Sequence, residues 1–210
     1  MGVKERRERE KLKTRETILD AARELFISEG YEGVSMRKIA DKIEYSPTAI
    51  YVHFADKDEL FREICHDDFR RLAQAFVAMG RIPDSIERLR KIGQAYVEFG
   101  LKNPNHYRTM FMVPHPPEAE EELDAQGRGN PEEDAYEFLR ATVAEAMKAG
   151  AFRDQLTDVD LVAQTMWAGV HGVISLQITQ KDDPWVPWRS MKRRSETMLD
   201  VLFKGILKER

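Results

Sequence analysis

The sequence contains a single cysteine and no long apolar run, and each absence excludes a class of protein. Cys65 cannot form an internal disulfide, and its helical spacing from Phe61, Leu72 and Phe76 favours a place in the core over a reactive thiol. No stretch approaches the roughly 18 uncharged apolar residues of a membrane span, and the N-terminus is charged where a secretory signal would be apolar. We therefore expect a cytoplasmic protein with no membrane partner.

The sequence also lacks the motifs of common enzymes. No nucleophile elbow, phosphate-binding loop or dinucleotide fingerprint is present. His66, Asp67 and Asp68 cluster, and His106 and His115 could join them as metal ligands, but the spacing fits no closed zinc site. We expect no catalytic residue, no metal and no cofactor.

The charged residues give a net charge of −4, which by itself argues against a nucleic-acid partner, but they are placed unevenly. The first fifteen residues carry seven Lys and Arg against three Glu. A basic arm on an acidic body suits local contact with phosphates and little adhesion elsewhere. The alternative is a solvated, frayed terminus.

Apolar residues recur with helical period along the whole chain, and no segment alternates as a strand would, so we expect an all-α fold of about nine helices. Pro83, Pro104, Pro131 and Pro187 mark four helix starts, and the segment between Met112 and Pro131 is expected to be a mobile loop. The expected helices are a first at about 14–29, a short one capped by Ser35, one from Pro47 to about Phe54, and others at about 57–80, 83–102, 104–112, 131–149, 158–180 and 187–208.

The two short helices and the tight turn between them have the dimensions of a helix-turn-helix, whose second helix enters the major groove of DNA. Residues at the start of that second helix would face base edges, with Arg37 on the helix before it as a possible addition. The candidates for base reading are Arg37, Tyr45, Ser46, Pro47, Thr48 and Ala49. Tyr51, His53 and Lys57 would contact phosphates, although Tyr51 and His53 could equally be packing residues of a small helical unit.

Residues 14–60 resemble the DNA-binding domain of the tetracycline-repressor (TetR/AcrR) family. The matching pieces are A-x-x-L-F, G-Y, S-x-x-x-I-A and S-x-x-x-I-Y-x-H-F-x-x-K-D-E-L, in that order. The resemblance implies a homodimer on a palindromic operator, usually a repressor released by a small molecule. Glu44 and Thr48 stand where the family often has glycine, so the operator sequence cannot be inferred from relatives.

We expect residues 1–57 to form the DNA-binding domain and residues 58–210 a helical body that pairs and senses. Residues 158–180 are apolar on every side, as is the end of the last helix, which suggests that both helices bury a second face against another copy. The expected pairing residues are Val170, Val173, Met198, Leu202, Gly205 and Ile206. A wholly monomeric core is the alternative.

A ligand pocket in such a body would be lined by aromatic residues and a few polar groups. The candidates are Tyr96, Phe99, Tyr107, Met110, Phe111, Phe138, Trp167 and His171, each of which could instead belong to the core. The motif W-x-x-x-H-G at residues 167–172 resembles a C-terminal subclass of the family, named WHG after these residues. A regulator that has no ligand, and an activator in place of a repressor, remain open alternatives.

Overall fold

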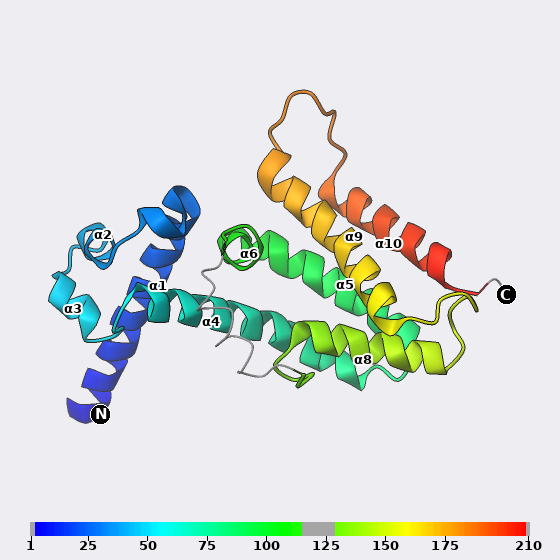
Figure 1. Cartoon of the computed structure of the whole chain (residues 1–210), viewed down its shortest axis with the longest axis horizontal. Helices are drawn as coiled ribbons and strands as arrows, with labels where there is room; N and C mark the ends of the chain where they lie inside the picture. The colour runs from blue at the N-terminus through cyan, green and yellow to red at the C-terminus, as the bar shows by residue number, and fades with distance from the viewer. Residues whose placement is uncertain (1–2, 115–128, 209–210) are drawn as a thin grey trace. The chain divides into compact units, whose positions relative to one another are not determined.

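The computed structural model describes residues 3–114 and 129–208, and the regular secondary structure of these residues is helical, as expected (Figure 1). They form nine α-helices and one 3₁₀ helix and contain no strand, only an isolated antiparallel bridge between Phe152 and Leu207. The elements are α1 (Val3–Gly33), α2 (Met36–Lys42), α3 (Pro47–Tyr51), α4 (Lys57–Val77), η1 (Ala78–Arg81), α5 (Ser85–Lys102), α6 (Pro104–Phe111), α8 (Ala135–Lys148), α9 (Val159–Gln180) and α10 (Met191–Ile206). Most of the predicted mobile loop, residues 115–128, lies outside the described residues.

The first helix begins eleven residues earlier than predicted, at Val3 where residue 14 was expected, so the basic arm is part of α1. The arm is rich in Lys, Arg and Glu, which favour helix, and Arg6 pairs with Glu10 one turn later at 2.9 Å. Gly30 has a positive φ of 72° and interrupts the helical dihedrals of α1 there.

Of the four predicted proline starts, only Pro104 is the first residue of its helix. The other three helices begin later, because a residue that follows the proline provides the N-cap. Asp84 accepts hydrogen bonds from the backbone N–H groups at the start of α5, Asp134 does so for α8, and Ser190 caps α10.

The chain divides into two compact units. Of the described residues, the first unit contains 3–68 and 105–114, and the second contains 69–104 and 129–208, so that α4 contributes to both units. The expected domain boundary after residue 57 stays a prediction. In the first unit, Phe26, Tyr31 and Phe61 form an aromatic cluster, and Cys65 is fully buried as predicted. Burial raises the pKa of the Cys65 thiol, which disfavours the reactive thiolate.

In the second unit, α5 packs against α8, α9 and α10, while α9 also packs against α8 and α10 (Figure 1). Two glycines let side chains of α10 approach closely. A methyl group at Gly93 would lie 2.6 Å from Leu199, and one at Gly169 would lie 2.7 Å from Leu202. None of the helices in the described residues has the length and apolar character that a membrane span requires.

Candidate DNA interface and effector site

The segment α2–turn–α3 is built by two serine caps. The Ser35 hydroxyl accepts from the backbone N–H of Lys38 at 3.3 Å, and the Ser46 hydroxyl accepts from that of Ala49 at 3.2 Å. Pro47 occupies the first turn of α3, where its missing N–H has no cost. Together these contacts fix where both short helices begin, as the sequence predicted.

The turn between α2 and α3 has a left-handed residue. Glu44 has φ 59°, and it is the sole residue other than glycine with positive φ in the described part of the chain. The turn is closed by a hydrogen bond from the backbone N–H of Tyr45 to the carbonyl of Ala40 at 3.0 Å. Glu44 therefore occupies a conformation that glycine would adopt without strain.

The start of α3 points outward. Ser46, Pro47 and Thr48 are exposed, as is much of Tyr45, while Ile50 is fully buried beneath them. Ala49 is half-buried. The predicted base-reading residues at the start of α3 thus share one exposed surface. The buried side chain of Ile50 anchors the helix on its other side.

The cations of α2 differ in their partners. Lys38 pairs with Glu29 at 2.5 Å and Lys42 pairs with Glu24 at 2.9 Å, so both are tied to α1. Arg37 is exposed, and no carboxylate of the described residues pairs with it. Arg37 is therefore the α2 cation that is available for an outside anion.

The three predicted phosphate contacts have different surroundings. The ring of Tyr51 is 54% exposed. Lys57 is engaged within the unit, because its ammonium donates to the Tyr31 carbonyl at 3.1 Å and lies 3.9 Å from the centre of the Tyr31 ring. His53 is half-buried, and burial, followed by the nearby charges of Lys11 and Arg15, lowers its pKa. A neutral His53 would meet a phosphate as a hydrogen-bond donor only.

A buried charge network links three helices of the first unit. Asp68 of α4 is 0% exposed, and it accepts from Arg23 of α1 at 2.9 and 3.2 Å. The Nδ1 atom of His106 of α6 lies 2.6 Å from the same carboxylate. Arg23 also reaches Asp20, which is on the surface.

This network was not predicted from the sequence, where Asp68 and His106 were candidates only as metal ligands. The described residues contain no group of His, Cys, Asp and Glu that could hold a metal ion. The sequence did contain a signal for a buried ion pair, namely one charged residue on the apolar face of each of the two helices α1 and α4. Arg23 lies among the apolar residues of α1, and Asp68 lies between Cys65 and Leu72 on α4.

A second polar cluster lies in the body, between α5 and α9. The indole N–H of Trp167 donates to the Tyr96 hydroxyl at 2.9 Å. The same hydroxyl lies 3.5 Å from Nδ1 of His171, to which it can donate its own proton. Burial lowers the pKa of His171, which favours the neutral imidazole that accepts such a bond. Tyr136 of α8 adds a ring 6.0 Å from that of Trp167.

The remaining predicted ligand residues lie elsewhere. Tyr107, Met110 and Phe111 are on α6 in the first unit, where the rings of Tyr107 and Phe111 are 4.8 Å apart. Phe138 faces Phe76 in the second unit, with ring centres 6.1 Å apart. The structure therefore brings Tyr96, Trp167 and His171 together and assigns the α6 residues to another compact unit. Phe99 is buried in α5, which also carries Tyr96.

The predicted pairing residues also divide into two sets. Val170 and Ile206 are buried within the chain itself, so little of either side chain is available to a partner. Val173, Met198 and Leu202 are half-buried, and Gly205 is exposed. Val201, which was not among the candidates, is 62% exposed.

One side of α9 is exposed and carries no charge. Leu161 and Leu176 on this side are 58% and 46% exposed. An added methyl group at Gly172 would meet nothing within 4 Å, and the same is true of Gly205 on α10. We call this side the uncharged face; it consists of Leu161, Thr165, Ala168, Gly172, Leu176 and Thr179, which follow one another at helical spacing.

Two family models match the chain. One, described as bacterial regulatory proteins of the tetR family, matches residues 18–64, and the other, described as a tetracyclin repressor-like C-terminal domain, matches residues 89–202. The expected resemblance of the body to the WHG subclass is not confirmed, because the C-terminal match carries this other description.

Two curated relatives and one solved structure illustrate the similarity. The HTH-type transcriptional repressor AcnR of Corynebacterium jeikeium is 37% identical over 65 residues, which cover 31% of this chain and 34% of the relative. The HTH-type transcriptional activator FasR of Mycolicibacterium smegmatis is 31% identical over 95 residues, which cover 45% and 43%. The chain thus matches less than half the length of either relative.

The solved structure is that of PfmR, a TetR family transcriptional regulator of Thermus thermophilus. It has a TM-score of 0.68 and 25% sequence identity, and the match covers 92% of this chain and 99% of that one. These three proteins are described as transcriptional regulators and not as enzymes.

Proposed function

Because the chain belongs to the tetR family of bacterial regulatory proteins, we propose that it is a homodimeric transcriptional repressor that binds a palindromic operator and is released by a small molecule. The observation that carries the DNA-binding part is the exposed first turn of α3, set on a buried Ile50. Since its target is chromosomal DNA, we place its action in the cytoplasm.

The exposed start of α3, which we call the reading surface, can make chemically distinct contacts with bases. The Thr48 hydroxyl can hydrogen-bond to several bases, while Pro47 and Ala49 can offer only apolar contact, for example to a thymine methyl group. Arg37, which has no acidic partner in the described residues, can bind a phosphate or a guanine edge. The helical basic arm would add phosphate contacts that set affinity without sequence preference.

Pairing of two copies is supported by the uncharged face of α9. Apolar side chains that remain exposed on a helix are unfavourable in water, and a second copy would cover them. Gly172 and Gly205 leave open space in which the backbone of a partner could approach. The exposed Val201 gives α10 an apolar contribution to the same pairing. Two recognition helices held about 34–36 Å apart would enter successive major grooves.

The proposed effector site is the cluster of Tyr96, Trp167 and His171. It combines aromatic surface with a hydroxyl and an imidazole whose protons can be redirected to a ligand. Tyr96 lies on α5, and only Asn103 separates α5 from α6, which carries His106. A ligand that displaces α5 would therefore act on α6 and on the His106–Asp68 contact. The operator affinity can fall by no more than the ratio of the ligand's affinities for the free and the operator-bound conformations, which is typically about 5- to 150-fold.

The test can begin without a known operator. Purified full-length chain is used to select binding sites from a pool of random duplexes, and its mass is measured on the selected site by analytical ultracentrifugation. We expect an inverted repeat occupied by two copies. Selection of no consensus, or of a single half-site occupied by one copy, would overturn the proposal. A chemical library is then screened for release from that site, and a promoter reporter distinguishes repression from activation.

A further inference from the structure

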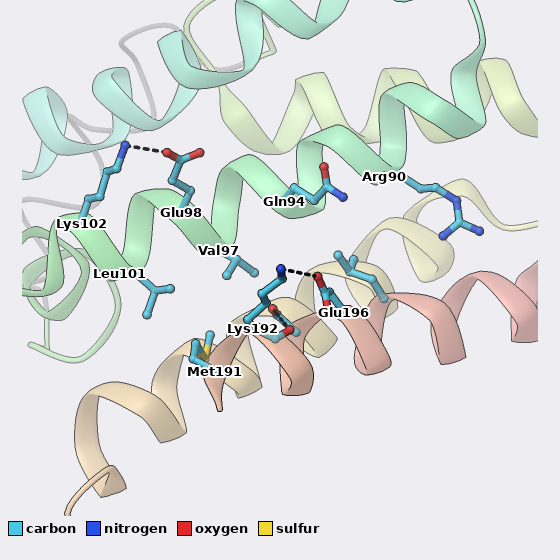
Figure 2. Close-up of a pocket in the computed structure, with 11 residues that line it drawn as sticks. Arg90, Gln94, Val97, Glu98, Leu101, Lys102, Met191, Lys192 and Glu196 are labelled. Atoms are coloured by element: carbon cyan, nitrogen blue, oxygen red, sulfur yellow. Dashed lines mark hydrogen bonds and ion pairs between the residues drawn. The ribbon is translucent and has the colours of Figure 1, made fainter. Parts of the chain in front are cut away.

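A groove of about 630 Å³ lies between α5 and α10 (Figure 2). The two helices run antiparallel here, because Arg90 contacts the ring of Phe203 while Gly93, further along α5, approaches Leu199. None of the predicted effector residues lines this groove. It is lined by Arg90, Gln94, Val97, Glu98, Leu101 and Lys102 of α5 and by Met191, Lys192, Ser195, Glu196 and Leu199 of α10.

The apolar side chains of the groove are not spread evenly along it. Figure 2 shows Arg90 at one end, then Gln94 and Val97, with Leu101 and Met191 toward the other end, where the charged side chains of Glu98, Lys102 and Lys192 also lie. Arg90 and Leu101 are eleven residues apart on one helix, which corresponds to about 16 Å. Leu199, whose side chain is buried against Gly93, forms apolar floor between the two ends. The groove therefore suits a molecule with one polar end and an apolar chain.

The charges of the groove leave one cation without an acidic partner. Lys102 pairs with Glu98 at 2.5 Å, and Lys192 pairs with Glu196 at 3.9 Å. No carboxylate of the described residues pairs with Arg90, whose guanidinium carbon lies 4.1 Å from the centre of the Phe203 ring. Stacking uses the face of the guanidinium and leaves its N–H edge for a planar anion.

We propose that this groove binds an amphipathic monocarboxylate. The carboxylate is held by the N–H edge of Arg90 and by the amide of Gln94, which lies one helical turn away. The hydrocarbon chain lies on Val97, Leu101 and Met191. This site is separate from the proposed effector cluster: Tyr96 faces Trp167, whereas its neighbour Val97 faces the groove.

Pairing through the uncharged face would leave the groove open. On α10, Leu199 lines the groove, whereas Val201 belongs to the proposed pairing surface. Residues two apart in a helix are separated by about 200° around its axis. The two surfaces therefore lie on opposite sides of α10, and both can be occupied at once.

The test is calorimetric titration of the full-length chain with dodecanoate, below the concentration at which it forms micelles. We expect one dodecanoate per chain and much weaker binding of dodecyltrimethylammonium, which has the same chain and the opposite charge. Arg90→Gln should weaken dodecanoate binding about 10- to 100-fold, because a charge-assisted hydrogen bond is removed. Lys91→Gln removes an exposed cation next to Arg90 but outside the groove, and should leave the affinity within about twofold.

A second variant tests the apolar end. Leu101 is 41% exposed, so Leu101→Glu should fold normally, which a thermal melt followed by circular dichroism checks. It should weaken binding of dodecanoate, since its carboxylate lies in the path of the hydrocarbon chain and would lose its hydration without gaining a partner. The proposal is overturned if wild type does not bind dodecanoate, if the cationic detergent binds equally well, or if Arg90→Gln and Leu101→Glu both bind as wild type does. Loss of binding in Trp167→Phe, with Arg90→Gln unaffected, would assign the ligand to the effector cluster and equally overturn it.

Discussion

The imidazole Nδ1 of His106 lies 2.6 Å from the carboxylate of Asp68, which also accepts two hydrogen bonds from Arg23. One buried carboxylate therefore holds α6 to α1 through α4. Asp68 satisfies a guanidinium that is itself almost removed from solvent, since the Arg23 side chain is 5% exposed. Such an ion pair stabilises the unit only while it is complete.

We predict that Asp68→Asn will lower the free energy of unfolding by about 3–5 kcal/mol, because the buried guanidinium of Arg23 then keeps only the exposed carboxylate of Asp20 as an acidic partner. The matched control is Asp20→Asn, which removes the exposed partner of the same arginine and should cost less than about 1 kcal/mol. Urea denaturation followed by circular dichroism measures both. Equal losses in the two variants would contradict a special role for the buried carboxylate.

Thr48→Ala should change operator preference, since the hydroxyl at the exposed start of α3 is the proposed base contact. We expect a loss of about 1–3 kcal/mol of discrimination at one base position in each half-site. Lys11→Gln, on the helical arm, should instead weaken binding to all sequences and flatten the log–log salt dependence by about 0.9 for each phosphate that is no longer neutralised. Site selection with both variants distinguishes these effects, and an unchanged consensus for Thr48→Ala would remove it from the reading surface.

Glu44→Gly should stabilise the protein. The left-handed φ of 59° costs a residue with a Cβ about 1–2 kcal/mol, and glycine would remove this cost. Glycine also makes the unfolded chain more flexible, which lowers the stability by about 0.5–1 kcal/mol. The net gain of up to about 1 kcal/mol corresponds to a rise in Tm of roughly 2–4 °C. As a control, Glu16→Gly in the exposed middle of α1 should cost about 1 kcal/mol. A fall in Tm for Glu44→Gly would show that its side chain contributes more than its backbone costs.

Val201→Glu should dissociate the proposed dimer, because two symmetric copies of a carboxylate would be buried without partners. Val201 is a cleaner target than Leu202, whose side chain already packs against Gly169 within the chain. Val77→Glu, at an exposed valine of α4, is the control for an added charge alone. Sedimentation equilibrium reports the mass of each, and a Val201→Glu protein that stays dimeric would locate the pairing surface elsewhere.

Acid should destabilise the protein in part through His171. Its pKa is lowered by burial, so below its ordinary value near 6.5 the unfolded chain takes up a proton that the folded chain resists. The corresponding stability is present above about pH 6.5 and is lost as the pH falls toward the lowered pKa. His171→Gln should flatten the decline of Tm between about pH 7 and pH 5. Parallel pH profiles for the variant and wild type would remove His171 as a source of the decline.

Local signals predicted most of the fold. Ser35, Ser46 and Pro47 act on backbone groups within a few residues, so the helix-turn-helix could be located closely. The predicted helix start at Pro83 was wrong, because Asp84 caps α5 and the proline remains outside the helix.

Long-range relationships were less predictable. Arg23 and Asp68 are 45 residues apart, and their pairing depends on how α1 packs against α4. Likewise, the assignment of Tyr107 and Trp167 to different compact units could not be inferred from aromatic spacing, which is the same for core and pocket residues. Helical period identifies a buried face but not which helix covers it.

The proposed recognition helix α3 has five residues, of which only Ile50 is buried. A helix of this length has almost no stability of its own, so its shape is maintained by the caps and by its anchoring side chain. Operator affinity then scales with the fraction of molecules in which α3 is formed. Moderate warming would lower that fraction while the larger helices of the body stay intact, so we expect the proposed operator binding to weaken on heating even without a ligand.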